Sequence, residues 1–560
     1  MPPSTSLSDN APTFSSPPPT VCPAGRFPFF GARPSDPGLL TVRALEAIRS
    51  ADVVVTERPG HVELVQSARD LPASGAAAAA PAAAVEIVEG GVGDDGAVLT
   101  HAARGRLVVK HARSGAHVVR LLDGDPFQHG TGPEEAQACA KAGVVFEVVP
   151  GISTAAAVPA YAGIPLTTRH RRELAVVRCG EGRIDWSLHG GDQTLVVIGV
   201  GRFVAEVARA LVAAGRSPQA PAAVTSAGTT TEQATVVSTL ERVAVAAKAA
   251  HLGDQSVLVV GDVVELRETL SWFETKPLFG WRVLVPRTKE QSAGLVARLR
   301  AYGAVPEEVP TISVEPPRNP QQMDKAIRGL VEGRYEWVAF TSVNAVKAVR
   351  EKFDEYGLDA RAFSGLKIAA VGERTAEAIT TWGIRPDLVP SGEQSARGLC
   401  EDWPAYDELL DPINRVFLPR ADIATETLVA GLVDLGWEVD DVTAYRTVRA
   451  APPPAPTREA IKSGKFDAVL FTSSSTVRNL VGIAGKPHPS TVIACIGPET
   501  VKTAEEHGLR VDVIAERPSA ELLADALADF GASRRLAMLQ AGEPVTRPSQ
   551  RRGPQRRKDT

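Results

Sequence analysis

The stretch Trp337-Val-Ala-Phe-Thr-Ser-Val-Asn-Ala-Val346 recurs further along the chain as Ala468-Val-Leu-Phe-Thr-Ser-Ser-Ser-Thr-Val477. In both copies an apolar run ends in Phe-Thr-Ser and is followed by residues typical of a helix. This pattern predicts a buried strand that delivers hydroxyl groups and backbone N–H groups to a helix N-terminus, where anions bind readily.

Two further segments repeat in the same order and at a similar spacing. Val283-Leu-Val-Pro-Arg287 corresponds to Val416-Phe-Leu-Pro-Arg420, and Ala369-Ala-Val-Gly-Glu-Arg-Thr375 corresponds to Ala494-Cys-Ile-Gly-Pro-Glu-Thr500. Two copies are too few for a solenoid, so the internal repeat predicts two similar α/β lobes that face each other across a cleft.

Composition excludes several classes of protein. A chain of 560 residues predicts three or more domains, and a net charge of −5 gives no overall bias toward nucleic acid. The five cysteines have no CxxC spacing, so neither a disulfide framework nor a zinc site is indicated. The chain has no apolar run of the ~18 residues that a membrane span needs, and no signal-peptide pattern. We expect a cytoplasmic protein that binds neither nucleic acid nor membrane.

Both ends of the chain have the composition of disordered segments. Residues 1–25 are rich in Ser and Pro, and the basic segment 536–560 is predicted to be a solvated tail. The Ala- and Pro-rich segment 74–84 is predicted to be a variable surface loop or short helix.

The first half of the chain alternates strands with helices, and several strands end in glycine. Examples are Asp123-Gly-Asp-Pro-Phe127 after a buried strand and Pro150-Gly-Ile-Ser-Thr154 after Phe146–Val149. Such an alternation predicts an α/β domain with ligand sites at the carboxyl ends of its strands. Glycine at these ends lets a ligand approach the backbone closely, so we expect a shared pocket.

Residues 26–275 resemble uroporphyrinogen-III C-methyltransferases in Asp123-Gly-Asp-Pro-Phe127, in Pro159-Ala-Tyr-Ala-Gly-Ile-Pro-Leu-Thr-Thr-Arg169 and in the ending Gly261–Phe273. The resemblance implies a fold of two α/β subdomains that bind S-adenosylmethionine between them, methylation of uroporphyrinogen III to precorrin-2, and a homodimer formed through this domain. By motif, the implied cofactor-binding residues are Pro34, Asp123, Gly124, Asp125, Gln128, Ser153, Thr154, Gly199 and Gly228.

Three features depart from that family's pattern. The first loop reads Gly31-Ala-Arg-Pro-Ser-Asp36, with side chains where the family usually has two glycines. Glu57 stands where the family has aspartate, and the family's Gly-Lys-Arg segment is absent. These departures leave open a retained fold with weakened catalysis.

The repeated region resembles uroporphyrinogen-III synthases over its whole length, after a junction at Lys276-Pro-Leu-Phe-Gly280. The resemblance implies a domain over 276–535. One lobe would comprise about 281–317 plus 448–530 and the other about 318–447. Two connecting segments would join them, near Val314–Pro317 and Tyr445–Arg449.

The resemblance implies hydroxymethylbilane, a linear tetrapyrrole with eight carboxylates, as substrate. Hydroxyls and N–H groups at helix N-termini would bind these carboxylates, and arginines would pair with them bidentately. For each Ser or Thr the alternative role is a helix N-cap. The candidate substrate-binding residues are Arg287, Thr341, Ser342, Asn344, Thr375, Arg420, Thr472, Ser473, Ser474 and Thr500.

The implied reaction releases the terminal hydroxyl as water, gives an azafulvene, and closes the ring with inversion of the last pyrrole. Tyr445 is the candidate catalytic residue because a phenol can donate a hydrogen bond to the departing hydroxyl; a buried connector tyrosine is the alternative. No cofactor or metal is expected for this half. The main interpretation is a synthase fused to a methyltransferase-like domain. One alternative is a fully bifunctional enzyme, and another is a two-lobed ligand-binding sensor.

Overall fold

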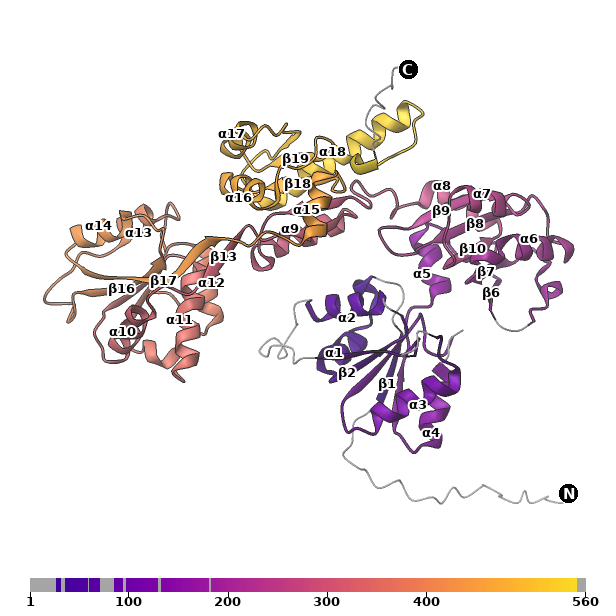
Figure 1. Ribbon diagram of the computed structural model, residues 1–560, viewed down its shortest axis with the longest axis horizontal. Helices are drawn as coiled ribbons and strands as arrows, with labels where there is room; N and C mark the ends of the chain where they lie inside the picture. The colour runs from indigo at the N-terminus through magenta and orange to yellow at the C-terminus, as the bar shows by residue number, and fades with distance from the viewer. Residues whose placement is uncertain are drawn as a thin grey trace, which may run out of the picture. The chain divides into compact units, whose positions relative to one another are not determined.

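The computed structural model describes residues 27–31, 36–58, 60–70, 85–93, 97–128, 132–180 and 183–550. The chain forms two compact units, Met1–Phe279 and Gly280–Thr560 (Figure 1). The predicted tail 1–25, the segment 74–84 and Pro34 lie outside the described residues. Among the described helices, none has both the length and the apolar character needed to cross a bilayer.

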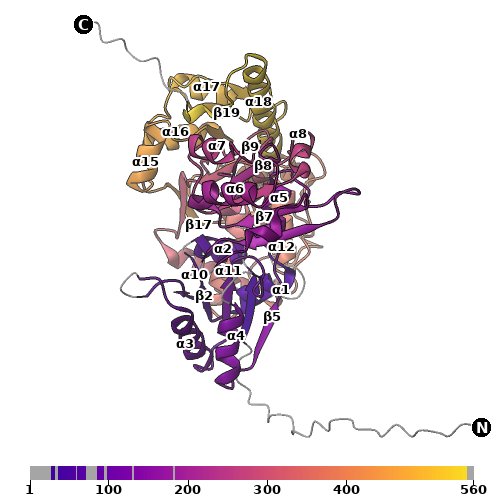
Figure 2. The same ribbon diagram turned by 90° about the vertical axis from the view of Figure 1, so that its right-hand side faces the viewer.

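The first half of unit 1 is a five-stranded parallel sheet in the order β3-β2-β4-β1-β5. Its central strands are buried on both faces, which explains their nearly continuous apolar sequences. Helices α1 and α2 pack on one face, and α3 and α4 lie side by side on the other (Figure 2). The bounds are β1 Phe27–Gly31, α1 Val42–Ser50, β2 Val53–Thr56, α2 Gly60–Asp70, β3 Glu86–Glu89, α3 His101–Ala112, β4 Val118–Leu122, α4 Gly132–Lys141 and β5 Phe146–Val149.

A buried ion pair crosses the core of this half. Arg120 on β4 donates from Nε to Glu135 Oε2 over 2.7 Å and from Nη2 to Oε1 over 2.9 Å. Both side chains are fully buried, so the bidentate pairing offsets a desolvation cost that neither charge could sustain alone. The pair fixes α4 against the strand that leads to Asp123.

The second half of unit 1 is a mixed sheet in the order β6-β7-β10-β8-β9. Strand β6 is parallel to β7, whereas β10 runs antiparallel to both β7 and β8. Helix α5, capped by Ser153, leads from the first sheet into this half. The bounds are α5 Thr154–Tyr161, β6 Leu174–Arg178, β7 Thr194–Ile198, α6 Val204–Ala213, β8 Pro221–Ser226, β9 Ala234–Thr239, α7 Val243–Ala249, β10 Ser256–Val260 and α8 Arg267–Leu270.

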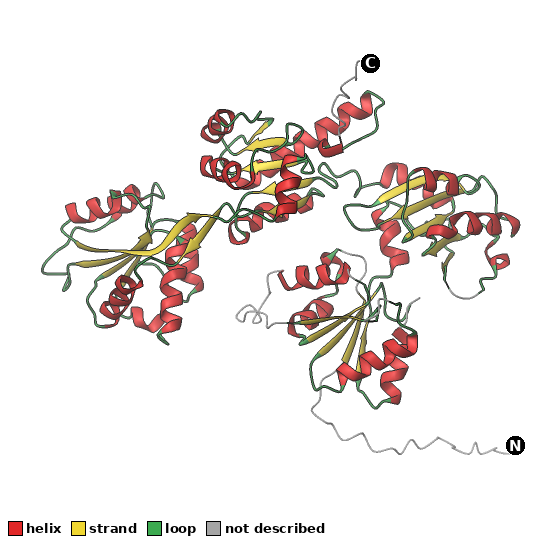
Figure 3. Ribbon diagram, viewed as in Figure 1, coloured by secondary structure: helices red, strands yellow, loops and turns green. Residues whose placement is uncertain are grey.

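Unit 2 contains two lobes built on sheets of similar topology. The terminal lobe (residues 282–308 and 455–540) has a parallel sheet in the order β12-β11-β18-β19-β20, flanked by helices (Figure 3). The bounds are β11 Arg282–Val285, α9 Lys289–Ala301, β12 Val305–Glu308, α15 Ala455–Lys462, β18 Ala468–Phe471, α16 Ser474–Ala484, β19 Val492–Cys495, α17 Pro498–Glu506, β20 Val513–Ile514 and α18 Ala520–Gln540.

The inserted lobe (residues 320–444) has parallel strands in the order β17-β16-β14-β15, and β13 adds to β17 at the edge of the sheet. The repeated sequences occupy equivalent strands, because β14 lies beside β16 as β18 lies beside β11. The bounds are β13 Ile312–Glu315, α10 Pro320–Val331, β14 Trp337–Phe340, α11 Val343–Glu355, β15 Lys367–Ala370, α12 Glu373–Thr381, α13 Ala396–Asp402, β16 Arg415–Ala421, α14 Thr427–Asp434 and β17 Glu438–Arg449.

A two-stranded antiparallel ribbon joins the lobes (Figure 1). Strand β17 is twelve residues long; its first part completes the inserted lobe and its last part pairs with β13. In this ribbon Val314 lies opposite Thr447 and Glu315 lies opposite Arg446.

The structure corrects the prediction of a disordered tail from residue 536. Helix α18 continues to Gln540, and the segment after it packs back onto the terminal lobe. Ser549 N–H donates to Asp467 Oδ1 over 2.8 Å, Pro548 is buried, and Arg547 donates to the Gly280 carbonyl. A basic composition alone did not reveal that the buried Asp467 carboxylate supplies an acceptor for this segment.

Candidate active sites

A cavity of about 160 Å³ lies in unit 1 where the loops after β4, β5 and β7 meet. The residues predicted by motif that line it are Asp123, Gly124, Asp125, Gln128, Ser153, Thr154 and Gly199. Asp125 ties two of the loops together, because its Oδ2 accepts the Gly151 N–H over 3.1 Å. Gly228 is not among the lining residues; it packs against Val158.

The cavity has a second wall that the sequence analysis missed. Asp254, Gln255 and Ser256 line it from the start of β10, opposite the end of β7. The sequence pattern predicts ligand groups at the carboxyl ends of strands. Because β10 is antiparallel to β7 and β8, its first residues lie at the same edge of the sheet as the carboxyl ends of those strands. No residue pattern in the sequence predicts that β10 runs in the opposite direction.

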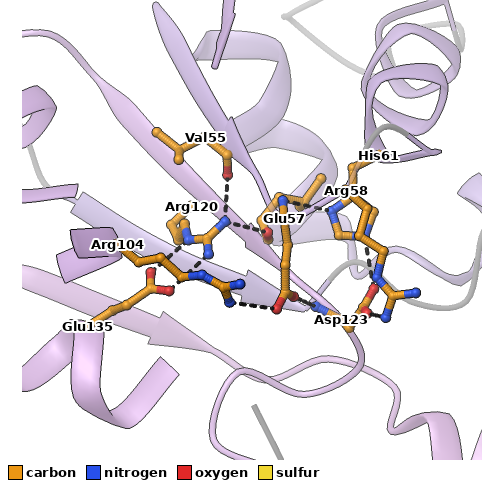
Figure 4. Close-up of polar contacts among 9 residues, drawn as sticks. Val55, Glu57, Arg58, His61, Arg104, Arg120, Asp123 and Glu135 are labelled. Carbon is orange, nitrogen blue, oxygen red and sulfur yellow. Dashed lines mark hydrogen bonds and ion pairs between the residues drawn. The ribbon is translucent and has the colours of Figure 1, made fainter. Parts of the chain in front are cut away.

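A polar network holds the Asp123 loop in place (Figure 4). Glu57 Oε2 accepts the Asp123 N–H over 3.1 Å, and Arg104 lies 3.5 Å from Glu57 Oε1. His61 Nδ1 faces the Glu57 N–H at 3.4 Å and therefore accepts, which leaves the ring proton on Nε2, 3.0 Å from Asp123 Oδ1. Glu57, which stands where the family has aspartate, thus holds the Asp123 loop in place through this backbone hydrogen bond.

Arg58 bridges the two walls of this cavity. Its guanidinium pairs with the Asp123 carboxylate and donates to Gln255 Oε1, so it links the first sheet of unit 1 to the second. Arg178 and Cys179, at the end of β6, line the same space. Burial raises the pKa of the Cys179 thiol, so this cysteine stays protonated at neutral pH.

A larger cavity of about 1080 Å³ lies in unit 2 beside the connecting ribbon. Its lining comes from both lobes and from the ribbon. One face of α11 contributes Asn344, Lys347 and Glu351, which recur at the i, i+3, i+7 spacing of a single helical face. Arg287 and Thr288 reach it from the end of β11.

Tyr445 lies in the wall of this cavity next to Ser342. The side chain is 7% exposed, and its hydroxyl lies 2.9 Å from Ser342 Oγ. The register of β16 and β17 shifts at this point, so that Arg420 pairs with Thr443 and Ala421 with Tyr445. Such a bulge places Ala444 and Tyr445 against the same core, although successive strand residues normally face opposite ways.

Cationic side chains from both lobes line this cavity. Arg287, Lys347 and Arg374 all line the cavity. Within the described residues, Lys347 and Arg374 have no ion-pair partner. Burial, and then the charge of Arg374, lower the pKa of Arg287. Arg287 was predicted from the sequence, whereas Lys347 and Arg374 were not, although Arg374 directly precedes Thr375 in a repeated motif.

Glu521 lies near these arginines at the start of α18. Hydrogen bonds from the Ser519 hydroxyl and from a backbone N–H, followed by the charges of Arg374 and Arg287, hold the pKa of Glu521 below its usual range. Its carboxylate is therefore charged at neutral pH and moderates the positive field of the two arginines.

The other predicted substrate-binding residues lie elsewhere on the two lobes. Ser473 caps α16, and Ser474 donates to the Glu499 carbonyl over 3.0 Å. Thr375 and Thr500 are buried in the first turns of α12 and α17. Thr341 follows β14, and the buried Thr472 hydroxyl has no hydrogen-bond partner among the residues that the structure describes. The N-cap alternative thus applies to Ser473, and also to Ser342, which accepts the Ala345 N–H over 3.2 Å.

Arg420 has a role inside the inserted lobe instead of in the cavity. The side chain is buried and pairs with both oxygens of Asp441, with Glu426 over 3.0 Å and with the Thr425 carbonyl. These partners occupy the guanidinium, so we do not retain Arg420 as a substrate-binding residue. Its repeat counterpart Arg287 does line the cavity.

Comparison with known proteins places each half in a described family. Residues 26–244 match the model of the tetrapyrrole (corrin/porphyrin) methylases, and residues 293–525 match that of uroporphyrinogen-III synthase HemD. The porphyrin biosynthesis protein HemD of Ruminiclostridium josui is 30% identical over 512 residues, which cover 90% of this chain and 97% of that protein.

Two further similarities concern the first half of the chain. Siroheme synthase 1 of Klebsiella pneumoniae is 39% identical over 259 residues; the match covers 45% of this chain and about half (51%) of that relative. A crystal structure of uroporphyrin-III C-methyltransferase from Thermus thermophilus is 30% identical, with a TM-score of 0.35 over 43% of this chain and 100% of that one.

The two family models follow one another along this chain, and the match to the Ruminiclostridium josui protein covers 90% of the chain. The chain therefore belongs to the family of porphyrin biosynthesis enzymes in which a tetrapyrrole methylase domain is followed by a uroporphyrinogen-III synthase domain.

Proposed function

We propose that unit 2 converts hydroxymethylbilane to uroporphyrinogen III in the cavity beside the connecting ribbon. One observation carries this proposal: the Tyr445 hydroxyl lies in the wall of a large cavity that cations also line, and two of these cations, Lys347 and Arg374, have no ion-pair partner within the described residues. The substrate has many carboxylates and one hydroxyl that leaves, so it needs both features.

Different residues of the cavity lining bind the substrate and take part in the reaction. Arg287, Lys347 and Arg374 pair with substrate carboxylates and fold the linear chain against the lobes. Tyr445 donates a hydrogen bond to the terminal hydroxyl as its C–O bond breaks. Closure without the enzyme gives the non-inverted isomer. The cavity must therefore hold the last pyrrole in the inverted orientation while the ring closes.

We propose in addition that the cavity of unit 1 binds S-adenosylmethionine, which would supply the methyl groups for uroporphyrinogen III. Gly124 and Gly199 line it with φ near +68° each, a conformation that favours glycine, and the absence of a side chain at both positions leaves space for a ligand. The hydroxyls of Ser153 and Thr154 and the carboxylate of Asp125 line the same space and suit a ligand that carries both ammonium and hydroxyl groups.

The size of this cavity sets a condition on binding. At about 160 Å³ it is smaller than the ~300 Å³ at which pockets for drug-sized ligands begin. Arg58 crosses it between Asp123 and Gln255. Entry of the cofactor would therefore require Arg58 to leave Gln255, which would remove this link between the two sheets of unit 1.

Replacing Tyr445 by Phe tests the proposed chemistry. We expect Tyr445→Phe to lower kcat at least tenfold with little change in KM, because a hydrogen bond to the leaving group acts in the transition state. The non-inverted isomer should rise as unaided closure competes. Stopped assays with chromatographic separation of the isomers measure both. Tyr356→Phe, at the exposed end of α11, serves as the control. An unchanged kcat would remove Tyr445 from the mechanism.

Removing single cations tests the proposed substrate contacts. We expect Arg374→Ala and Lys347→Ala each to raise KM for hydroxymethylbilane by roughly 3- to 10-fold, as loss of a charged contact does. The effect should shrink at high salt because exposed pairs are screened. Arg350→Ala, on α11 but outside the cavity lining, is the matched control. Equal KM values for Arg374→Ala, Lys347→Ala and Arg350→Ala would contradict this placement of the substrate.

A glycine substitution tests the proposed cofactor site. We expect Gly124→Ala to weaken S-adenosylhomocysteine binding at least tenfold by calorimetry, because a Cβ would lie 3.2 Å from Thr154 Oγ1 in a left-handed residue. Gly115→Ala carries a similar backbone penalty with open space around it, and should bind normally. Synthase turnover should be unchanged in both variants. Equal affinities in the two variants would contradict the site.

A further inference from the structure

The side chains of Ser342 and Tyr445 form a hydrogen-bonded pair in unit 2. The two oxygens lie 2.9 Å apart although the residues are separated by 103 positions in sequence. Both side chains line the large cavity of unit 2. Ser342 is the N-cap of α11, and Tyr445 comes from the connecting strand β17.

The other contacts of Ser342 and Tyr445 bear on which of the two hydroxyls donates in this pair. Ser342 Oγ already accepts the Ala345 N–H over 3.2 Å, which leaves its own proton to donate. Within the described residues, the Tyr445 hydroxyl has Ser342 as its one hydrogen-bond partner. If Ser342 donates to Tyr445, the phenol proton remains available on the cavity side. If Tyr445 donates to Ser342, that proton is withdrawn from the cavity.

Comparing the two copies of the internal repeat distinguishes the helix-capping role of Ser342 from its contact with Tyr445. Ser473 is the counterpart of Ser342 and caps α16 in the same way, accepting the Thr476 N–H over 3.3 Å. Its other hydroxyl contact is with Ser475 Oγ at 2.9 Å, and in the described part of the chain it has no hydrogen bond to a tyrosine. Capping is therefore the role that both copies share, and the contact with a phenol belongs to the inserted lobe alone.

We propose that Ser342 is a positioning residue that donates its hydroxyl proton to Tyr445 and thereby keeps the phenol proton directed at the departing hydroxyl of the substrate. This inference rests on the proposed synthase function of unit 2. The chain of donors runs from the Ala345 N–H through Ser342 to Tyr445, and each bond polarises the next.

The step balances without any further reactant. As the C–O bond of the hydroxymethyl group breaks, its electron pair stays on oxygen, Tyr445 gives that oxygen its proton, and water leaves. The pyrrole nitrogen loses its proton as the azafulvene forms, and this proton restores the phenol. Meanwhile the bond from Ser342 stabilises the negative charge that develops on the Tyr445 oxygen.

Three substitutions of Ser342 test this role. We expect Ser342→Ala and Ser342→Gly to lower kcat by about 3- to 10-fold, the effect of one lost hydrogen bond, with KM unchanged. Glycine retains most N-cap function, so a loss in both variants separates the contact with Tyr445 from helix capping. Ser342→Thr keeps the hydroxyl and should restore kcat. The fraction of non-inverted product should rise in the two slow variants.

A matched control and a double variant decide the interpretation. The Ser395 hydroxyl caps α13 in the same lobe and accepts the Gly398 N–H over 3.2 Å, the same distance as in the Ser342 cap. Ser395→Ala removes this cap and should leave kcat unchanged. In a Tyr445→Phe background, Ser342→Ala should cause no further loss, because the residue acts through the phenol.

The outcomes distinguish this inference from the proposed function. If Tyr445→Phe lowers kcat but Ser342→Ala does not, or the two losses multiply, Ser342 is not a positioning residue and the synthase proposal stands. If Ser395→Ala lowers kcat as much as Ser342→Ala, the effect comes from a weakened helix and the inference is wrong. If Tyr445→Phe itself turns over normally, the proposed function of Tyr445 fails first.

Discussion

The pairing of β13 with β17 is the constraint on which unit 2 depends. Strand β17 is at once a strand of the inserted lobe, where it pairs with β16, and one side of the ribbon that joins the lobes. Because the same strand carries Tyr445, the geometry of the connection and the position of the phenol are set together. Cations from both lobes line the cavity beside this ribbon, so a change in the ribbon would also displace the proposed substrate contacts.

The internal repeat made much of this fold predictable. The copies at Phe340-Thr-Ser342 and Phe471-Thr-Ser473 each end a buried strand and begin a helix, as the apolar runs indicated. The pattern also predicted hydroxyls at helix N-termini, and the structure shows both serines as caps. A sequence pattern locates a hydroxyl at a helix start; it does not reveal whether the free side of that hydroxyl faces a cavity.

The features that escaped prediction are those set by tertiary structure. The bulge opposite Ala421 turns Tyr445 toward the core and has no sequence signature. Arg420 and Arg287 follow the same Val-x-x-Pro motif, yet one is neutralised by Asp441 and the other lines the cavity. In unit 1 the reversal of β10 brings Gln255 to the cavity, where Arg58 then bridges both walls. Partners distant in sequence decide each of these cases.

The most direct test of this account is the product that the full-length protein forms from hydroxymethylbilane without a methyl donor, separated by isomer. The account predicts uroporphyrinogen III as the main product, formed faster than the unaided reaction, because the cavity beside the ribbon holds the last pyrrole inverted. Formation of the non-inverted isomer alone, at the unaided rate, would contradict it.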